Sequence, residues 1–193
     1  MSQPENFTKS AQYSLTKPII LVGFMGAGKT AIGQVLAAML GAPFVDSDDE
    51  IVKAANMSIA EIFARDGEDF FRQKEHQILE RLVTNNTTVL STGGGAFISE
   101  KNQKLLCDTG FVIWLNADME LTWARVKDNP KRPLLQVENA YEEMVKLYEK
   151  RQPSYSAAHA KWQSMAGESK EAAAKRLLAL ISSDTRAGLK KEA

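Results

Sequence analysis

The sequence has little of what marks several large classes of protein. Its 193 residues contain one cysteine, Cys107, which excludes an internal disulfide framework and a cysteine-rich zinc cluster and suits a reducing compartment. Lysine plus arginine and aspartate plus glutamate each number 24, so no excess of positive charge favours nucleic acid or a membrane surface as a partner. No apolar run has the length of a membrane span, and no internal repeat is present. These absences favour a cytoplasmic protein whose anion-binding sites are local.

The length of the chain fits one compact α/β domain. The polar stretch 1–17 lacks the apolar core of a signal peptide, so we expect it to be a disordered leader. The charged stretch 183–193 is expected to be a polar tail. The domain is therefore expected at 18–182, and because no long apolar stripe is left over, we expect a monomer.

Short β-branched runs alternate with amphipathic stretches along this domain. Strand patterns occupy 19–22, 43–45, 88–90, 111–115 and 161–165, and helical patterns occupy 29–40, 58–83 and 138–150. Ser58 and Glu61 form a capping box at the start of the second helical pattern. This alternation predicts a parallel sheet between helices, with ligands bound at the carboxyl ends of the strands.

The segment 23–30, GFMGAGKT, fits the pattern G-x-x-x-x-G-K-[ST] and lies between a strand pattern and a helical pattern. Its glycines let backbone N–H groups surround phosphate oxygens, Lys29 can reach the terminal phosphates, and the Thr30 hydroxyl can bind Mg²⁺. The sequence therefore predicts a P-loop that binds a nucleotide. The residues expected to bind it here are Gly26, Ala27, Gly28, Lys29, Thr30 and Ala31.

Other classes of P-loop protein fit the sequence less well. The motifs N-K-x-D and D-x-x-G, which are typical of GTPase switches, occur nowhere in the chain. Motor-type ATPases end a strand with an acidic residue, whereas the strand pattern at 88–90 runs into Ser-Thr-Gly-Gly-Gly. A small-molecule kinase remains the interpretation that fits best.

Asp46 and Asp48 flank Ser47 directly after the second strand pattern. Alternation along an extended chain points both carboxylates to the same side, towards the P-loop if the strand is central. One of them could then hold Mg²⁺ through water, and the other could orient a substrate hydroxyl for phosphoryl transfer. The alternative is an acidic helix N-terminus, reinforced by Asp49 and Glu50. Beside a P-loop, we favour the catalytic interpretation.

Arg72 and Glu75 share one face of the helix expected at 58–83. An arginine there could grip a carboxylate through two hydrogen bonds, whereas the alternative is a solvent-exposed Arg72–Glu75 ion pair. Three consecutive glycines, 93–95, contribute no side-chain packing. They favour either a close approach of the backbone to a ligand or a flexible turn.

Charge and proline between 127 and 138 predict an excursion from the sheet, and we expect a lid at about 126–138. Arg132 lies in this lid and Arg125 on the helix that leads into it. Arginines there could close over a triphosphate and exclude water, and solvated surface positions are the alternative. Arg151 is expected just beyond the helix at 138–150, where a cation is electrostatically favoured in any case.

Taken in order, these motifs resemble the shikimate kinase family over about residues 18–182. The series is GFMGAGKT, DSD, GEDFFR, STGGG, RPLL and KRQPSY. The resemblance implies transfer of the γ-phosphoryl group of ATP, with Mg²⁺, to the 3-hydroxyl of shikimate, giving shikimate 3-phosphate in aromatic amino-acid biosynthesis. It also implies a three-layer P-loop fold with a five-stranded parallel sheet of order 2-3-1-4-5, a substrate-binding segment at about 46–80 and a lid.

The resemblance also implies roles for single residues. Asp48 matches the aspartate that contacts the reacting hydroxyl, and Asp46 matches the one that helps Thr30 to hold Mg²⁺ through water. Arg125 is expected along the adenine. The expected catalytic residues are Lys29, Asp48 and Arg132, with Arg132 also on the nucleotide. The expected acceptor-binding residues are Asp48, Arg72, Glu75, Gly93, Gly94, Gly95 and Arg151. The segment 166–169, AGES, departs from the family's adenine-contacting loop, so no adenine contact is assigned to it.

Two other interpretations use the same P-loop. A gluconate-type or other small-metabolite kinase would need a different acceptor site, against which Arg72, Arg151 and the three glycines argue. A protein that binds ATP without transferring phosphate would have little use for Lys29, Asp48 and Arg132 together.

Overall fold

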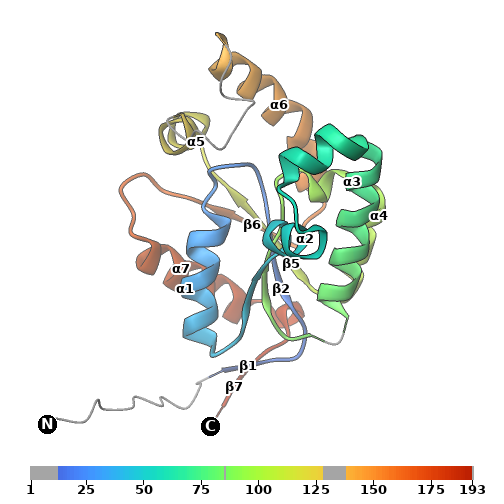
Figure 1. The fold of residues 1–193 in the computed structure, drawn as a ribbon. Coiled ribbons are helices and arrows are strands. Elements are labelled where there is room, and N and C mark those ends of the chain that lie inside the picture. The colour runs from blue at the N-terminus through green and yellow to red at the C-terminus, as the bar shows by residue number, and fades with distance from the viewer. Residues whose placement is uncertain (1–12, 85, 128–137, 193) are drawn as a thin grey trace, which may run out of the picture.

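The computed structural model describes residues 13–84, 86–127 and 138–192 (Figure 1). Arg132 and most of the segment in which a lid is expected lie outside these ranges. In the part of the chain that is described, no helix is both long and apolar enough to span a membrane.

The centre of the fold is a five-stranded parallel sheet of order β3-β4-β2-β5-β6. Its strands, in chain order, are β2 (Ile19–Val22), β3 (Phe44–Asp46), β4 (Val89–Ser91), β5 (Phe111–Asn116) and β6 (Ala160–Gln163). Ile19 of β2 pairs with Val89 on one side and with Phe111 on the other. Counted along the chain, this order is 2-3-1-4-5, so the expected fold class is confirmed.

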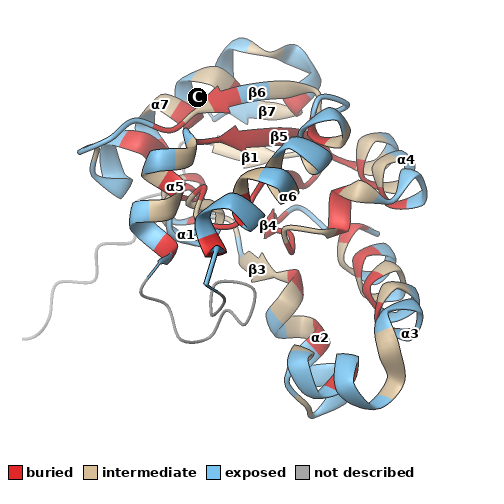
Figure 2. Ribbon diagram, turned by 90° about the horizontal axis from the view of Figure 1, so that it is seen from above, coloured by how far each residue is buried: buried red, intermediate tan, exposed pale blue. Residues whose placement is uncertain are grey.

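Helices cover both faces of the sheet and make three layers (Figure 1). Strand alternation divides β2 between two cores: Ile19 and Leu21 belong to one buried cluster, and Ile20 and Val22 to the other. The first cluster packs under α1 (Lys29–Leu40) and α7 (Lys170–Ser183). The second packs under α3 (Ile59–Val83), α4 (Glu100–Thr109) and α6 (Ala140–Tyr155). Figure 2 shows buried residues concentrated on the strands and on the helix faces towards them.

The substrate-binding segment expected at about 46–80 consists of α2 (Ser47–Ala55) and most of α3. The predicted capping box forms, because the Ser58 hydroxyl accepts from the Glu61 N–H and the Glu61 carboxylate accepts from the Ser58 N–H. Gly67 has a φ of 82°, which bends α3 near its start. A small third cluster of Ile51, Ile62 and Phe71 joins the two helices.

The chain ends differ from the expectation that 1–17 and 183–193 lie outside the fold. β1 (Tyr13–Leu15) pairs antiparallel with β7 (Leu189–Lys191) beside the amino end of β2. The pairing is favourable because Tyr13, Leu15 and Leu189 pack against the core under α1 and α7. Two short 3₁₀ helices, Ala96–Ile98 and Thr185–Ala187, and α5 (Met119–Val126) complete the described elements.

Candidate active site

The polar and glycine-rich turns of the chain meet at the carboxyl ends of the strands. The P-loop follows β2, Asp46 ends β3, and Ser91 ends β4, with Thr92 between it and the three glycines. Asp46 and Ser91 lie opposite one another in the β3–β4 register. This convergence follows from the parallel topology, which brings all five carboxyl ends to one edge of the sheet.

The P-loop is a turn between β2 and α1 that only glycine can form. Gly23 has a φ of 140°, and a side chain on it would strike the backbone carbonyl of Leu115 on β5. Gly28 caps α1 with a φ of 98° and offers no side chain to the first N–H groups of the helix, which leaves them for an anion. The Lys29 ammonium donates to the carbonyl oxygens of Gly23 (2.8 Å) and Phe24 (3.0 Å) and so lies folded along the loop. Gly26 and Ala27 lie in the same turn.

Thr30 and Ala31 follow in the first turn of α1, where the Thr30 hydroxyl donates to Asp46 Oδ2 at 2.9 Å. Close to this pair lies the Ser91 hydroxyl, which is buried and has no hydrogen-bond partner within the described ranges. Three oxygens thus gather where the P-loop meets β3 and β4. Hydroxyl and carboxylate oxygens are the donors that Mg²⁺ prefers, so these residues fit that ion.

Asp48 lies in the first turn of α2, because Asp46 caps this helix by accepting from the Asp48 N–H at 3.0 Å. The predicted acidic N-terminus of a helix therefore exists, and the catalytic and capping interpretations of the two carboxylates are compatible. Ser47, between them, is buried and accepts from the Gly93 N–H at 3.1 Å, which fixes the glycine turn to α2.

Each of the three glycines after β4 faces one of the charged residues expected at the acceptor site. A methyl group on Gly93 would strike the Asp48 carboxylate. One on Gly94 would lie 3.8 Å from Arg151 Nη1, and one on Gly95 would lie 2.9 Å from Arg72 Nη1. The turn is therefore the place where side chains from α2, α3 and α6 converge, and the flexible-turn alternative does not explain this packing.

Arg72 on α3 is held by two carboxylates. Its Nη1 donates to Glu75 Oε2 at 2.9 Å, and its Nη2 and Nε donate to Glu68 Oε1 at 3.1 and 3.3 Å. Glu75 is buried, with 1% of its surface exposed, so the alternative of a solvent-exposed Arg72–Glu75 pair is wrong. Burial raises the pKa of Glu75 and the charge of Asp48 adds to this effect, whereas Arg72 and Arg151 oppose it.

Arg151 lies within α6, not beyond a helix end as expected, because α6 continues through Pro153 to Tyr155. Arg151 and Tyr155, four residues apart, share one face of this helix. Arg151 Nη1 donates to the Gly94 carbonyl at 3.3 Å, and the Tyr155 hydroxyl donates to the same oxygen at 2.5 Å.

A cavity of about 480 Å³ opens between α3 and α6 beside these groups. Arg72 and Arg151 both line it, with Gly95 between them and with Glu68 and Lys150 nearer the solvent. A pocket lined by two arginines suits a small carboxylate.

Arg125 joins the P-loop to the segment that follows β6, the strand at one edge of the sheet. Its guanidinium donates to the Gly26 carbonyl at 3.0 Å and to the Ser164 hydroxyl at 3.1 Å, just after β6. It therefore lies between the phosphate loop and the segment 166–169, where a nucleotide base on the P-loop side of the site would reach it. Arg132 alone among the expected site residues lies outside the described ranges.

Sequence reasoning missed three groups that the structure brings to this site. Ser91 carries no sequence signal beyond its position before the glycines. Glu68 lies four residues before Arg72, a spacing that does predict an ion pair on a helix. Tyr155 would have been found only if α6 had been extended through Pro153.

The hydroxyl of Tyr155 gives a test of how the glycine turn is held. Burial raises the pKa of Tyr155 to about 12, so it remains a hydrogen-bond donor at neutral pH. Tyr155→Phe should lower the free energy of unfolding by about 1–3 kcal/mol, because the Gly94 carbonyl keeps only its weaker bond to Arg151. Denaturant unfolding measures this change. Tyr141→Phe, at a ring that is 39% exposed, is the control, and an equal effect of the two would contradict the role given to Tyr155.

Comparisons with known proteins agree with this geometry. The family model described as "Shikimate kinase" matches residues 25–182. The shikimate kinase of Cereibacter sphaeroides is 52% identical over 144 residues, which cover 75% of this chain and 72% of that protein. The one from Ruegeria pomeroyi is 50% identical over 145 residues, covering 75% and 74%.

A solved structure extends the likeness to three dimensions. Shikimate kinase from Acinetobacter baumannii, in complex with shikimate, superimposes with a TM-score of 0.82 at 39% identity, covering 86% of this chain and 93% of that one. A family model that spans most of the domain, relatives half identical in sequence and a shared fold lead to one conclusion: this chain belongs to the shikimate kinase family.

Proposed function

We propose that the site described above transfers the γ-phosphoryl group of ATP to the 3-hydroxyl of shikimate, with Asp48, Arg72 and Arg151 as the groups that hold the acceptor. Membership of the family makes the chain an ATP-using kinase that acts on an alcohol group. One observation carries the choice of acceptor residues: Asp48, Arg151 and Arg72 all approach the turn 93–95, and the two arginines line one small cavity beside it.

The nucleotide half of the reaction belongs to the P-loop. Backbone N–H groups of residues 26–31 surround the phosphates at the start of α1, and Lys29 turns from the loop carbonyls to the terminal phosphates. Arg125 lies along the adenine. Arg132 is proposed to bring a further positive charge to the phosphates from the lid, a role that rests on the sequence.

The acceptor half of the site needs arginines that bind the carboxylate of the acceptor and a carboxylate side chain that accepts a proton from its hydroxyl. Arg72 and Arg151 bind the carboxylate, and Glu75 orients Arg72 from beneath. Asp48 accepts the proton of the acceptor hydroxyl. As it does so, the hydroxyl oxygen forms a bond to the γ-phosphorus, and the bond between the γ-phosphorus and the oxygen that leaves with ADP breaks. The backbone of Gly93, Gly94 and Gly95 lies against the shikimate ring, and a side chain on any of these glycines would exclude that ring.

Thr30, Asp46 and Ser91 are proposed to hold Mg²⁺, Asp46 and Ser91 through water. When bound, the ion neutralises the charge that develops on the phosphate oxygens. We further propose a cytoplasmic monomer with a single kinase domain, and with ATP and shikimate, not nucleic acid or a membrane, as its partners.

The first experiment measures ADP release with ATP and Mg²⁺ in the presence of shikimate, of gluconate or of no acceptor. Shikimate-dependent release is expected, and Lys29→Ala should reduce it by 100-fold or more, an estimate of about 3 kcal/mol for a lost phosphate contact in the transition state. Gluconate-dependent release would favour the gluconate-type kinase, and release without an acceptor would contradict phosphoryl transfer to an alcohol.

Asp48→Asn separates the two halves of the site. The amide keeps the shape of the side chain but is a much poorer proton acceptor, so kcat should fall by about 100-fold or more while the affinity for ATP stays within a few fold. Steady-state kinetics measure kcat, and a separate titration with a fluorescent ATP analogue measures the affinity for the nucleotide. Equal losses of turnover and ATP binding would mean that Asp48 acts on the nucleotide or on the fold.

Glu68 is proposed to stand in for the substrate carboxylate while the site is empty. Its Oε1 accepts from Nη2 and Nε of Arg72, the donors on one edge of the guanidinium, while Glu75 takes Nη1. The Glu75 side chain is 2% exposed and cannot move away, but that of Glu68 is 65% exposed. An incoming carboxylate therefore displaces Glu68 and keeps Glu75.

Glu68→Gln should accordingly lower the KM for shikimate by about 2- to 5-fold, the range for an exposed ion pair, with kcat and the KM for ATP unchanged. Asp69→Asn removes the same charge from the next residue, which forms no ion pair with another residue that the structure describes, and should leave all three constants unaltered. A rise in the shikimate KM of Glu68→Gln would mean that Glu68 holds Arg72 in its binding position.

A further inference from the structure

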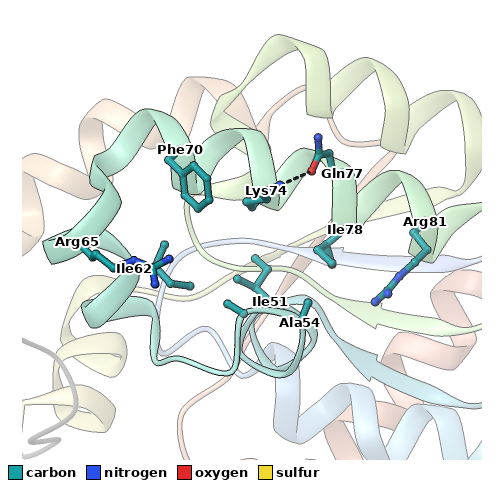
Figure 3. A pocket seen from close by; sticks show the side chains of 10 residues that line it. Ile51, Ala54, Ile62, Arg65, Phe70, Lys74, Gln77, Ile78 and Arg81 are labelled. Atoms are coloured by element: carbon teal, nitrogen blue, oxygen red, sulfur yellow. Dashed lines mark hydrogen bonds between the residues drawn. The ribbon is translucent and has the colours of Figure 1, made fainter.

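The α2–α3 segment has a second hollow, which we call the rear groove. It holds about 480 Å³ between α2 and the part of α3 that follows Gly67. Figure 3 shows Phe70, Lys74 and Ile78 of α3 facing Ile51 and Ala54 of α2 across it. The volume is in the range of small-molecule sites.

The rear groove and the acceptor cavity lie on different faces of α3. Phe70, Lys74 and Ile78 repeat every four residues and line the groove, whereas Glu68 and Arg72 line the acceptor cavity. At about 100° per residue, Phe70 and Arg72 point about 200° apart around the helix. The two hollows have no lining residue in common, so a ligand in one leaves the other open.

The floor of the rear groove is apolar. Ile51 and Ile62 come from the small cluster that joins the two helices, and Ile78 packs against the same cluster. Phe70 forms a wall and is 36% exposed, a large fraction for an aromatic ring beside a hollow. These groups would gain from covering by an apolar ring.

Three cations surround this floor, and two of them already have carboxylate partners. Arg65 is paired with Asp66 at 2.7 Å, and Arg81 with Glu50 at 3.1 Å. Lys74 differs, since its one hydrogen bond among the described residues goes to the neutral amide oxygen of Gln77 at 3.2 Å (Figure 3). Its ammonium also lies 5.4 Å from the centre of the Phe70 ring.

We infer that the rear groove is a binding site for a small organic anion with one carboxylate and a single apolar ring. Its ring lies on Ile51, Ile62 and Ile78 against Phe70, and its carboxylate pairs with Lys74. A single charge is specified because, among the described residues, one of the three cations lacks a carboxylate partner. An occupant of this size spans α2 and α3, the helices that carry Asp48 and Arg72.

The test uses 3-phenylpropionate as the probe and the full chain saturated with shikimate. Nuclear magnetic resonance of the ¹⁵N-labelled protein follows the amides of α2 and α3 during the titration. Saturable changes in chemical shift are expected at the amides of residues 51–55 and 70–81. The expected Kd is about 1 mM or below, which is typical of a ligand of this size. The neutral 3-phenylpropanol should bind about 5-fold more weakly or worse, because it cannot pair with Lys74.

Lys74→Gln should weaken the binding of 3-phenylpropionate by about 5- to 10-fold and leave that of the alcohol unchanged. Lys53→Gln is the matched control, because Lys53 is an exposed lysine on α2 that already pairs with Glu50 at 2.8 Å. Both variants should retain the kinetic constants for shikimate without the probe, so a failure of the proposed reaction would be seen separately.

Three outcomes would overturn the inference. Binding of the probe only when shikimate is left out would place it in the acceptor cavity. If Lys74→Gln and Lys53→Gln weakened the binding of 3-phenylpropionate equally, the weakening would come from the lost net charge and not from a contact with Lys74. Equal affinities of acid and alcohol for the unaltered chain would leave an apolar surface without a carboxylate site.

Discussion

The close approach of side chains to the glycine turn 93–95 is the constraint on which the acceptor site depends. Side chains from three helices lie close to this turn. A methyl group at Gly93 would displace Asp48, and one at Gly95 would displace Arg72. The turn is itself fixed by Ser47 and Tyr155, which bind its N–H and carbonyl groups. The site is thus assembled around backbone, whose position depends on the sheet and on these two buried side chains.

This arrangement explains how like and unlike charges can share a small volume. Arg72 and Arg151 would repel each other in an apolar pocket, but buried Glu75 lies within electrostatic reach of both. Burying Glu75 is costly alone, and its ion pair with Arg72 at 2.9 Å offsets that cost while fixing the guanidinium. In the proposed function, an acceptor carboxylate would then meet two arginines that are already oriented, which reduces the entropy lost on binding.

Sequence reasoning succeeded where local chemistry decides the structure. The P-loop and the capping box rest on short patterns of residues, whereas the strand order was expected only from the family resemblance. Contacts between distant segments were harder to predict. The β1–β7 pair joins three-residue strands from opposite ends of the chain, too short for any periodicity to mark. Arg151 was expected outside its helix because proline usually ends one, yet α6 continues two residues past Pro153 to Tyr155.

The α2–α3 segment is also the part of the domain with the smallest apolar core. Ile51, Ile62 and Phe71 are its only fully buried cluster among the described residues, whereas the sheet has two much larger ones. Free energies of local opening follow such differences in burial, so this segment should move more readily than the P-loop and the strands beneath it. The contacts of Asp48 and Arg72 with the glycine turn are then what aligns a movable segment with a rigid phosphate site. An acceptor that binds Arg72 and Arg151 together bridges α3 to α6 and strengthens that alignment at the moment when transfer requires it.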